Sequence, residues 1–113
     1  MARYRLRYFF DPGADICLWA ANDSARERFG YPVDASRLHL SENTSRRVRY
    51  LAAWHHTSID WEYPPDPSPW DANERARFDA EAQRLLALLR EELGPAFEIL
   101  DESGTSSASR IRD

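Results

Sequence analysis

The chain has 113 residues, of which 42% are hydrophobic and 30% charged, and its formal net charge is −4. This composition is typical of a folded soluble domain and excludes a disordered chain. The longest apolar run, Ile16 to Ala21, has six residues, far fewer than the roughly 20 that a membrane-spanning helix needs. We therefore expect no membrane segment, one domain over residues 1–102 and a flexible polar tail over residues 103–113.

The N-terminal residues predict a β-hairpin. Residues 3–10, RYRLRYFF, alternate between apolar and basic side chains, which indicates a strand with one buried face. Pro12 and Gly13 lie in a predicted turn over residues 11–15. Residues 16–21, ICLWAA, are apolar on both faces, so they predict a second strand and the more central one of the pair.

Two helices are predicted next. Asn22, Asp23 and Ser24 each offer a side-chain acceptor for the start of a short helix over about residues 23–29, which Gly30 and Pro32 end. Residues 34–40 fit either a short strand or a loop. Ser41 can cap a longer helix that continues to about residue 57, with one wide apolar face.

A third helix is predicted to begin in the sequence Ser-Pro-Trp-Asp. Ser68 is the expected N-cap, Pro69 the first helical residue and Asp71 the partner in a capping box. The apolar spacing continues to Leu93, and residues 97–100, FEIL, predict a last strand. The predicted fold class is therefore α+β with two layers: a small antiparallel sheet, made by the N-terminal hairpin and the C-terminal strand, packed against two longer helices and one short helix.

Few residue patterns point to catalysis. His55 and His56 are adjacent, so on a helix their rings diverge by about 100 degrees and cannot easily bind one metal ion. Asp60 and Glu62 could form an acid/base pair, but acids flanked by prolines are usually solvated. A glycine-rich phosphate loop and a nucleophile elbow are both missing from the sequence. We expect no metal and no cofactor, and the sequence disfavours an enzyme.

Charge and cysteine content bear on partner and compartment. Residues 1–60 hold nine arginines and seven acids, whereas residues 61–113 hold six and twelve. The acidic second half disfavours nucleic-acid binding and favours a partner with a basic surface. The lone Cys17 cannot form an intramolecular disulfide, which is typical of a cytoplasmic protein.

The sequence DWEYPPDPSPW, residues 60–70, has two interpretations. Its aromatic side chains could fold back on the helices as a structural clamp, or a stiff aromatic segment rimmed by acids could bind a partner. Strand-like alternation would allow both, because Trp61 and Tyr63 would point one way and Asp60 and Glu62 the other. The candidate partner-binding residues are Asp60, Trp61, Glu62, Tyr63, Asp66 and Trp70.

The runs YFFDPGADICLWAANDSARERFGYPVD and HHTSIDWEYPPDPSPW resemble a family of small uncharacterised proteins from G+C-rich, actinobacterial-type genomes. The resemblance covers residue 3 to about residue 100 and implies no activity. In size, charge and composition the chain is also similar to the immunity proteins and antitoxins that neutralise bacterial toxins.

The leading functional hypothesis is a non-enzymatic cytoplasmic binding protein, of immunity or antitoxin type, that covers a basic surface on another protein. The alternative is a small enzyme or ligand-binding domain with a pocket between sheet and helices. That pocket would be lined by Tyr8, Trp19, Trp54 and His55. A weaker alternative is a nucleic-acid mimic that uses the acids of the second half.

Overall fold

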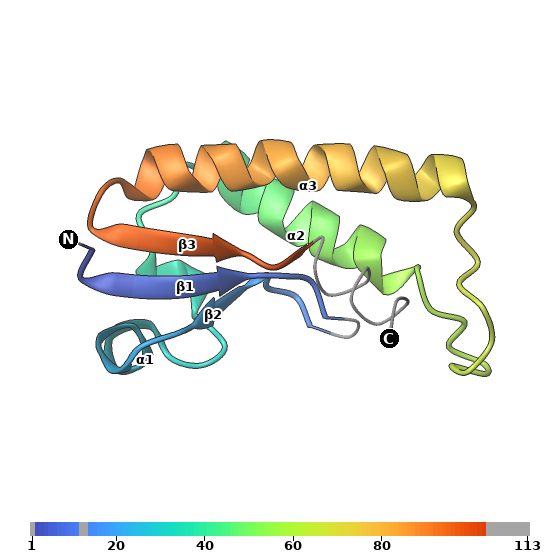
Figure 1. Cartoon of the computed structure of the whole chain (residues 1–113), viewed down its shortest axis with the longest axis horizontal. Coiled ribbons are helices and arrows are strands. Elements are labelled where there is room, and N and C mark those ends of the chain that lie inside the picture. The colour runs from blue at the N-terminus through green and yellow to red at the C-terminus, as the bar shows by residue number, and fades with distance from the viewer. Residues whose placement is uncertain (1, 12–13, 104–113) are drawn as a thin grey trace.

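The computed structural model describes residues 2–11 and 14–103 (Figure 1). Most of the predicted tail and the tip of the first turn, residues 12 and 13, lie outside the described residues. The α+β class is confirmed. The elements are β1 (Tyr4–Tyr8), β2 (Leu18–Ala20), α1 (Asp23–Phe29), the 3-10 helix η1 (Ala35–Arg37), α2 (Glu42–His56), α3 (Ala72–Leu93) and β3 (Phe97–Asp101).

The three strands form a mixed sheet in the order β2-β1-β3. β2 pairs antiparallel to β1, as the hairpin requires, but β3 pairs parallel to β1, with Leu6 opposite Ile99. The prediction of an antiparallel sheet is therefore wrong for β3. The reason is the route of the chain: α3 runs back along the sheet, so β3 begins at the same end as β1 (Figure 1).

β1, not β2, is the central strand, so the sequence prediction was wrong on this point as well. β2 is apolar on both faces for a different reason. One face lies on the main core, and on the other face the ring of Trp19 stacks on Phe9 at 4.9 Å and contacts Tyr31. Because aromatic neighbours bury its second face, the edge strand β2 has apolar residues on both faces, as a central strand usually does.

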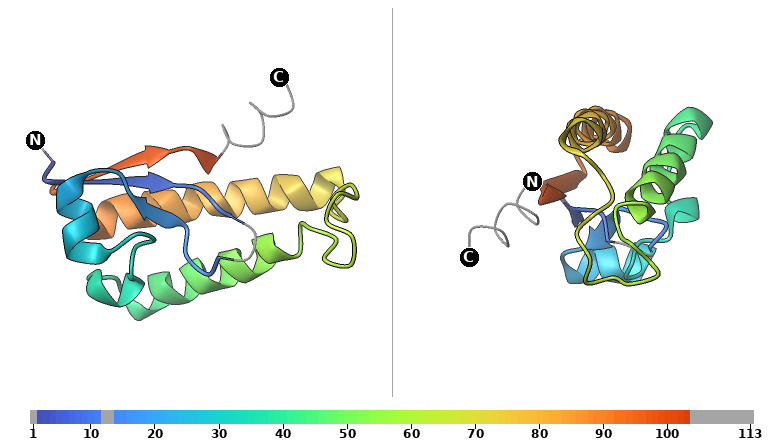
Figure 2. Two further views of the ribbon diagram at one scale, coloured as in Figure 1. Left: turned by 90° about the horizontal axis from the view of Figure 1, so that it is seen from below. Right: turned by 90° about the vertical axis from the view of Figure 1, so that its right-hand side faces the viewer.

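The two long helices cover one face of the sheet, as the right-hand view of Figure 2 shows. Leu6 and Tyr8 point into this layer and are fully buried, and the hydroxyl of Tyr8 donates a hydrogen bond to the Ala82 carbonyl of α3 at 2.6 Å. The opposite face carries ion pairs from Arg5 to Glu98 and from Arg7 to Glu102. The alternation of residues 3–10 is therefore confirmed, with Arg5 paired to an acid on β3 and Arg7 to one just beyond it.

Side-chain caps fix the starts of the helices. Asn22 accepts from the Ala25 amide at the start of α1, and Ser41 accepts from the Thr44 amide at the start of α2, as predicted. α3 begins later than predicted, at Ala72, because Asp71 accepts from the Glu74 amide at 2.7 Å. Residues 34–40 form neither a strand nor a plain loop, since η1 lies within them.

β3 lies at an edge of the sheet. Arg90 of α3 reaches over this strand and donates a hydrogen bond to the Ile99 carbonyl at 2.7 Å. The side chain thus ties the end of the long helix to the strand that follows it.

Candidate functional site

The most exposed aromatic segment joins α2 to α3 and projects from one end of the molecule (Figure 1). All residues from 61 to 69 are exposed. Trp61 retains 48% of its accessible surface and Tyr63 60%, although side chains of this size are usually well buried. Two large exposed aromatic side chains within three residues mark this segment as the candidate site.

Consecutive turns, not a strand, shape the segment. The Tyr63 amide donates to the Asp60 carbonyl at 3.1 Å, and the Asp66 amide donates to the Tyr63 carbonyl at 2.9 Å. The side chain of Asp60 also accepts from the Glu62 amide at 3.1 Å. The strand-like alternation predicted from the sequence is therefore wrong, because Asp60 and the prolines favour turns.

Trp61 rests on the C-terminal end of α2. Its indole N–H donates to the His56 carbonyl at 2.6 Å, and its ring stacks on the His56 ring at 4.4 Å. One face of the indole is thereby covered and the rest is open to a partner. Tyr63 is exposed further along the segment, with no hydrogen bond from its hydroxyl to any described residue.

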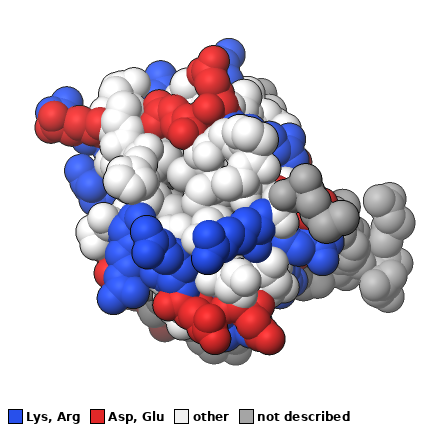
Figure 3. Space-filling view, turned by 90° about the vertical axis from the view of Figure 1, so that its left-hand side faces the viewer, with Lys and Arg blue, Asp and Glu red and all other residues white. Residues whose placement is uncertain are grey.

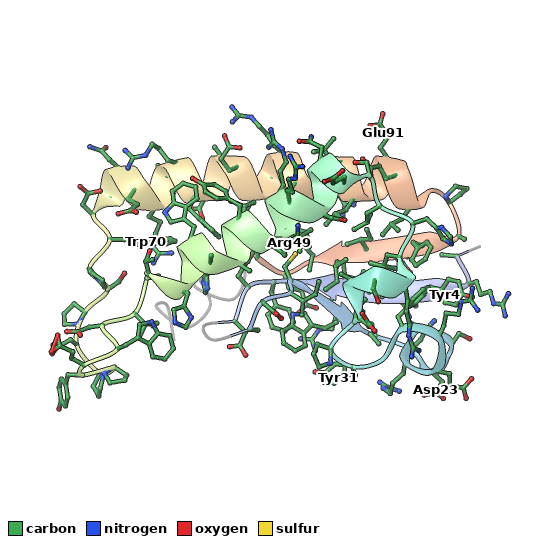
Figure 4. All side chains as sticks on the ribbon, turned by 180° about the vertical axis from the view of Figure 1, so that it is seen from behind. Tyr4, Asp23, Tyr31, Arg49, Trp70 and Glu91 are labelled. Carbon is green, nitrogen blue, oxygen red and sulfur yellow. The ribbon has the colours of Figure 1, made fainter. Side chains whose placement is uncertain are left out.

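Trp70, at the other end of the segment, is buried. Its indole N–H donates to the hydroxyl of Thr57 at 2.7 Å, and its ring lies 5.0 Å from that of Phe78 and 5.9 Å from that of Trp54. Arg75 stacks over it at 5.3 Å. Figure 4 shows Trp70 between the end of α2 and the start of α3. Trp70 therefore anchors the C-terminal end of the segment to the two helices and leaves little surface for a partner to contact.

Three acids accompany the exposed aromatic side chains: Asp60, Glu62 and Asp66. The carboxyl groups of Asp60 and Asp66 lie close together, and the contact with Asp60 raises the pKa of Asp66. With both groups ionised the segment concentrates negative charge in a small area. We call residues 60–66, of which 61–66 are exposed, the acidic turn segment.

Of the four residues of the predicted pocket, Trp19 lies apart from the other three. Tyr8 and Trp19 lie on opposite faces of the sheet, since Tyr8 pairs with Leu18 and Arg7 with Trp19. Trp54 is partly buried at the surface of α2, and its indole N–H donates to Glu74 at 2.9 Å. His55 belongs to the same aromatic cluster as Trp54, since both rings contact Trp70 and Phe78. Tyr8 joins this cluster through Phe10.

His55 is an unusual core residue. Its ring packs against Phe10, Trp70 and Phe78 at 5.5 to 6.1 Å, and its Nδ1 atom has no hydrogen-bond partner in the described structure. Burial is the main cause that lowers the pKa of His55 to about 4, and the charge of Arg75 adds to the effect.

Other chemical groups give no sign of a reactive centre. Cys17 is fully buried, and burial raises the pKa of its thiol to about 12, so it stays protonated. Within residues 2–11 and 14–103, His, Cys, Asp and Glu side chains form no group of three or more that could hold a metal ion. Nor does any helix in the described part of the chain have the length and apolarity to cross a membrane.

The end of the molecule opposite the acidic turn segment carries basic side chains. Figure 3 views this end and shows basic side chains in a band beneath an area without charged side chains. A small cavity of about 160 Å³ lies there, lined by aromatic and apolar residues together with Arg28 and Arg37. Sequence reasoning missed this cavity because Phe29, Leu38 and Phe97 come from separate elements.

A groove of about 490 Å³ between α2 and α3 was also missed. It contains the exposed Tyr50 together with Trp54 and several charged residues, which lie some 30 positions apart in the sequence. The only sequence signal for it is the repeated arginine on the outer face of each helix.

A comparison with curated proteins finds no match. The family model described as Serratia CdiI immunity protein-like matches residues 5–101, which extend from β1 to the last residue of β3 and include the acidic turn segment. The chain therefore belongs to the Serratia CdiI immunity protein-like family.

Proposed function

We propose that this protein is an immunity protein of the contact-dependent inhibition type, which acts inside the cell by binding and neutralising a protein toxin. The family match over residues 5–101 supports the class. The acidic turn segment supplies part of the contact, and the toxin presents a basic surface to it.

The observation that carries this proposal is the exposure of Trp61 and Tyr63 on a segment that is already ordered. Trp61 is hydrogen-bonded to α2, and two backbone turns hold the residues between Asp60 and Asp66. A preordered aromatic pair loses little conformational entropy on binding, so more of its burial energy is available for affinity.

The acids have a separate role in the proposed interface. Asp60, Glu62 and Asp66 surround the aromatic pair at a site with no ion pair to any described arginine. Unpaired acids attract a basic partner and increase the association rate more than the final affinity. A nucleic-acid mimic is less favoured, because Glu81, Glu98 and Glu102 are each paired with arginine.

The test takes the product of the neighbouring gene as the candidate toxin and measures its direct binding by calorimetry, together with growth of cells that express it. The double variant Trp61→Ala/Tyr63→Ala should weaken binding by at least about 30-fold, as expected for the loss of two aromatic anchors, and should reduce protection of the cells. Asp60→Asn, Glu62→Gln and Asp66→Asn, combined, should slow association and reduce its dependence on salt.

Tyr31→Ala is the matched control, since Tyr31 is also an exposed aromatic residue, at 54%, and is far from Trp70 (Figure 4). This variant should bind the toxin like the native protein. If the double variant keeps full affinity and full protection while remaining folded, the acidic turn segment is not the contact.

A further inference from the structure

The groove between α2 and α3, which we call the α2–α3 groove, combines aromatic and basic side chains. Leu51, Trp54 and Ala80 contribute apolar surface, and Tyr50 remains 67% exposed beside them. Arg47 enters from α2, and Arg77 and Arg84 enter from α3. With Glu81 as the single acid, the groove carries an excess of positive charge on a protein whose net charge is negative.

The arginines differ in how firmly they are held. Arg84 is bound to Glu81 one helical turn away, and Arg47 reaches the same carboxylate from α2 at 3.4 Å, which is long for an ion pair. Within the described residues Arg77 has no ion pair and no hydrogen bond. The Arg77 guanidinium is therefore free of described partners, and the Arg47 guanidinium is held only by its long contact with Glu81.

We propose that the α2–α3 groove binds an acidic segment of the partner protein, with a partner carboxylate held by Arg77 and Arg47 and a neighbouring apolar side chain packed on Tyr50 and Trp54. A planar guanidinium can bind a carboxylate through two parallel hydrogen bonds. The volume of about 490 Å³ is sufficient for a few residues of an extended segment. This inference rests on the proposed function for the nature of the partner.

The charge of the α2–α3 groove favours a peptide over a nucleic acid as its ligand. A nucleic acid gains affinity by engaging several arginines or lysines with successive phosphates. Here Glu81 already neutralises part of the basic charge, and Glu74 lies next to Trp54 at 2.9 Å from its indole nitrogen. One free guanidinium and one loosely held guanidinium are enough for a single carboxylate but too few for a run of phosphates.

One end of the groove lies near Trp70, the residue that anchors the loop between α2 and α3. The ring of Trp54 lies 5.9 Å from that of Trp70, and Trp70 anchors the segment that carries Trp61. A partner that contacts both regions would present a basic patch to the turn segment and an acidic patch to the groove. This opposed charge pattern would fix the orientation of the partner as well as its affinity.

The first experiment uses a short fluorescein-labelled peptide rich in glutamate with one phenylalanine, and fluorescence anisotropy reports its binding to the full chain. Binding should weaken by at least about tenfold in Arg77→Glu, because a like charge then faces the peptide. It should also weaken when salt is raised from about 50 to about 300 mM. In the ¹⁵N spectrum the Trp54 indole signal should shift on addition of the peptide.

Arg49→Glu is the matched control. Arg49 is on α2, the other helix of the groove, and like Arg77 it lacks an ion pair among the described residues, but it lines a different cleft, with Asp15 and Val33. It should bind the peptide like the native chain. Equal losses in Arg77→Glu and Arg49→Glu would overturn the groove assignment, and so would an absence of binding.

A single-stranded RNA of the same negative charge is the competing probe. If RNA binds the groove more tightly than the peptide, the inference is wrong and the groove is a nucleic-acid site.

Measurements of toxin binding separate this inference from the proposed function. If Trp61→Ala/Tyr63→Ala abolishes toxin binding and Arg77→Glu does not, the proposed function stands and the groove has no part in it. If Arg77→Glu weakens toxin binding and the double variant does not, the assignment of the acidic turn segment as a contact fails.

Discussion

The two ends of the segment between α2 and α3 each carry a tryptophan, and the two tryptophans have different surroundings. Trp70 is buried among Trp54, His55 and Phe78, whereas Trp61 covers His56 with one face and exposes the other. Both indole N–H groups are hydrogen-bonded to the C-terminal end of α2 or the residue after it. The difference shows that one short segment combines a structural anchor with a surface available for binding.

The largest effect on stability is expected at the anchor. Trp70→Ala removes a buried indole from contact with three aromatic rings and leaves a cavity, so the free energy of unfolding should fall by about 3–5 kcal/mol. Urea denaturation followed by circular dichroism measures this change. A loss below about 1 kcal/mol would mean that Trp70 is not the residue that fixes the segment.

The second prediction concerns His55 and pH. Because the pKa of His55 is about 4 in the folded protein, below its ordinary value of 6.5, the unfolded chain takes up the proton first. The stability associated with neutral His55 is therefore complete above pH 6.5 and is lost as the pH falls toward 4. Partial exposure of the ring reduces the loss to about 1–2 kcal/mol.

Comparison with His55→Phe isolates this contribution, because carboxylates also titrate in the same range. The variant should lose less stability than the native protein between pH 6.5 and pH 4, as measured by thermal unfolding at each pH. Arg75, Asp11 and His56 are the charged groups that act on His55, and they are unchanged in the variant. His39→Gln, at an exposed histidine, should follow the native curve.

The third prediction compares the two candidate caps of α3. Asp71→Ala should lower the free energy of unfolding by about 1 kcal/mol, because the Glu74 amide loses its acceptor. Ser68→Ala should have a smaller effect, since the Ser68 hydroxyl accepts only a 3.2 Å hydrogen bond from the Trp70 amide. Chemical denaturation of both variants decides the order, and equal effects would contradict the assignment of Asp71 as the cap.

The exposed end of the segment should contribute much less to stability than the buried end. Trp61→Ala should lower the free energy of unfolding by about 1 kcal/mol, the value of one net hydrogen bond, and Tyr63→Ala by less. Toxin binding should show the reverse order, with Trp61→Ala more harmful than any change that leaves Trp61 in place. Thermal unfolding and calorimetry on the same samples test the contrast with Trp70.

Local patterns predicted the elements well where residues at both ends define them. Asn22 and Gly30 bound the short helix α1, and its predicted range, 23–29, is confirmed. The cap at Ser41 and the end of α3 at Leu93 are confirmed in the same way. These signals depend on side chains within a few residues of the helix end, so a sequence contains them in full.

Features that depend on the path of the chain were not predictable. The parallel pairing of β3 follows from the direction of α3, and no residue of β3 encodes it. The α2–α3 groove needs Arg47 and Arg77 side by side, which only the packing of two helices determines. The partner-binding role of residues 60–66 remains a prediction. The sequence named the segment as a candidate, and only the structure shows that its Trp70 is buried and its Trp61 exposed.

The hydrogen bond from Arg90 to the Ile99 carbonyl has a consequence for the protein when no toxin is present. An open strand edge can recruit a strand from another copy, which is a common route to aggregation. The guanidinium occupies the carbonyl that a foreign strand would need as an acceptor, and it places a positive charge along that edge. Pairing of a second copy along β3 is therefore disfavoured.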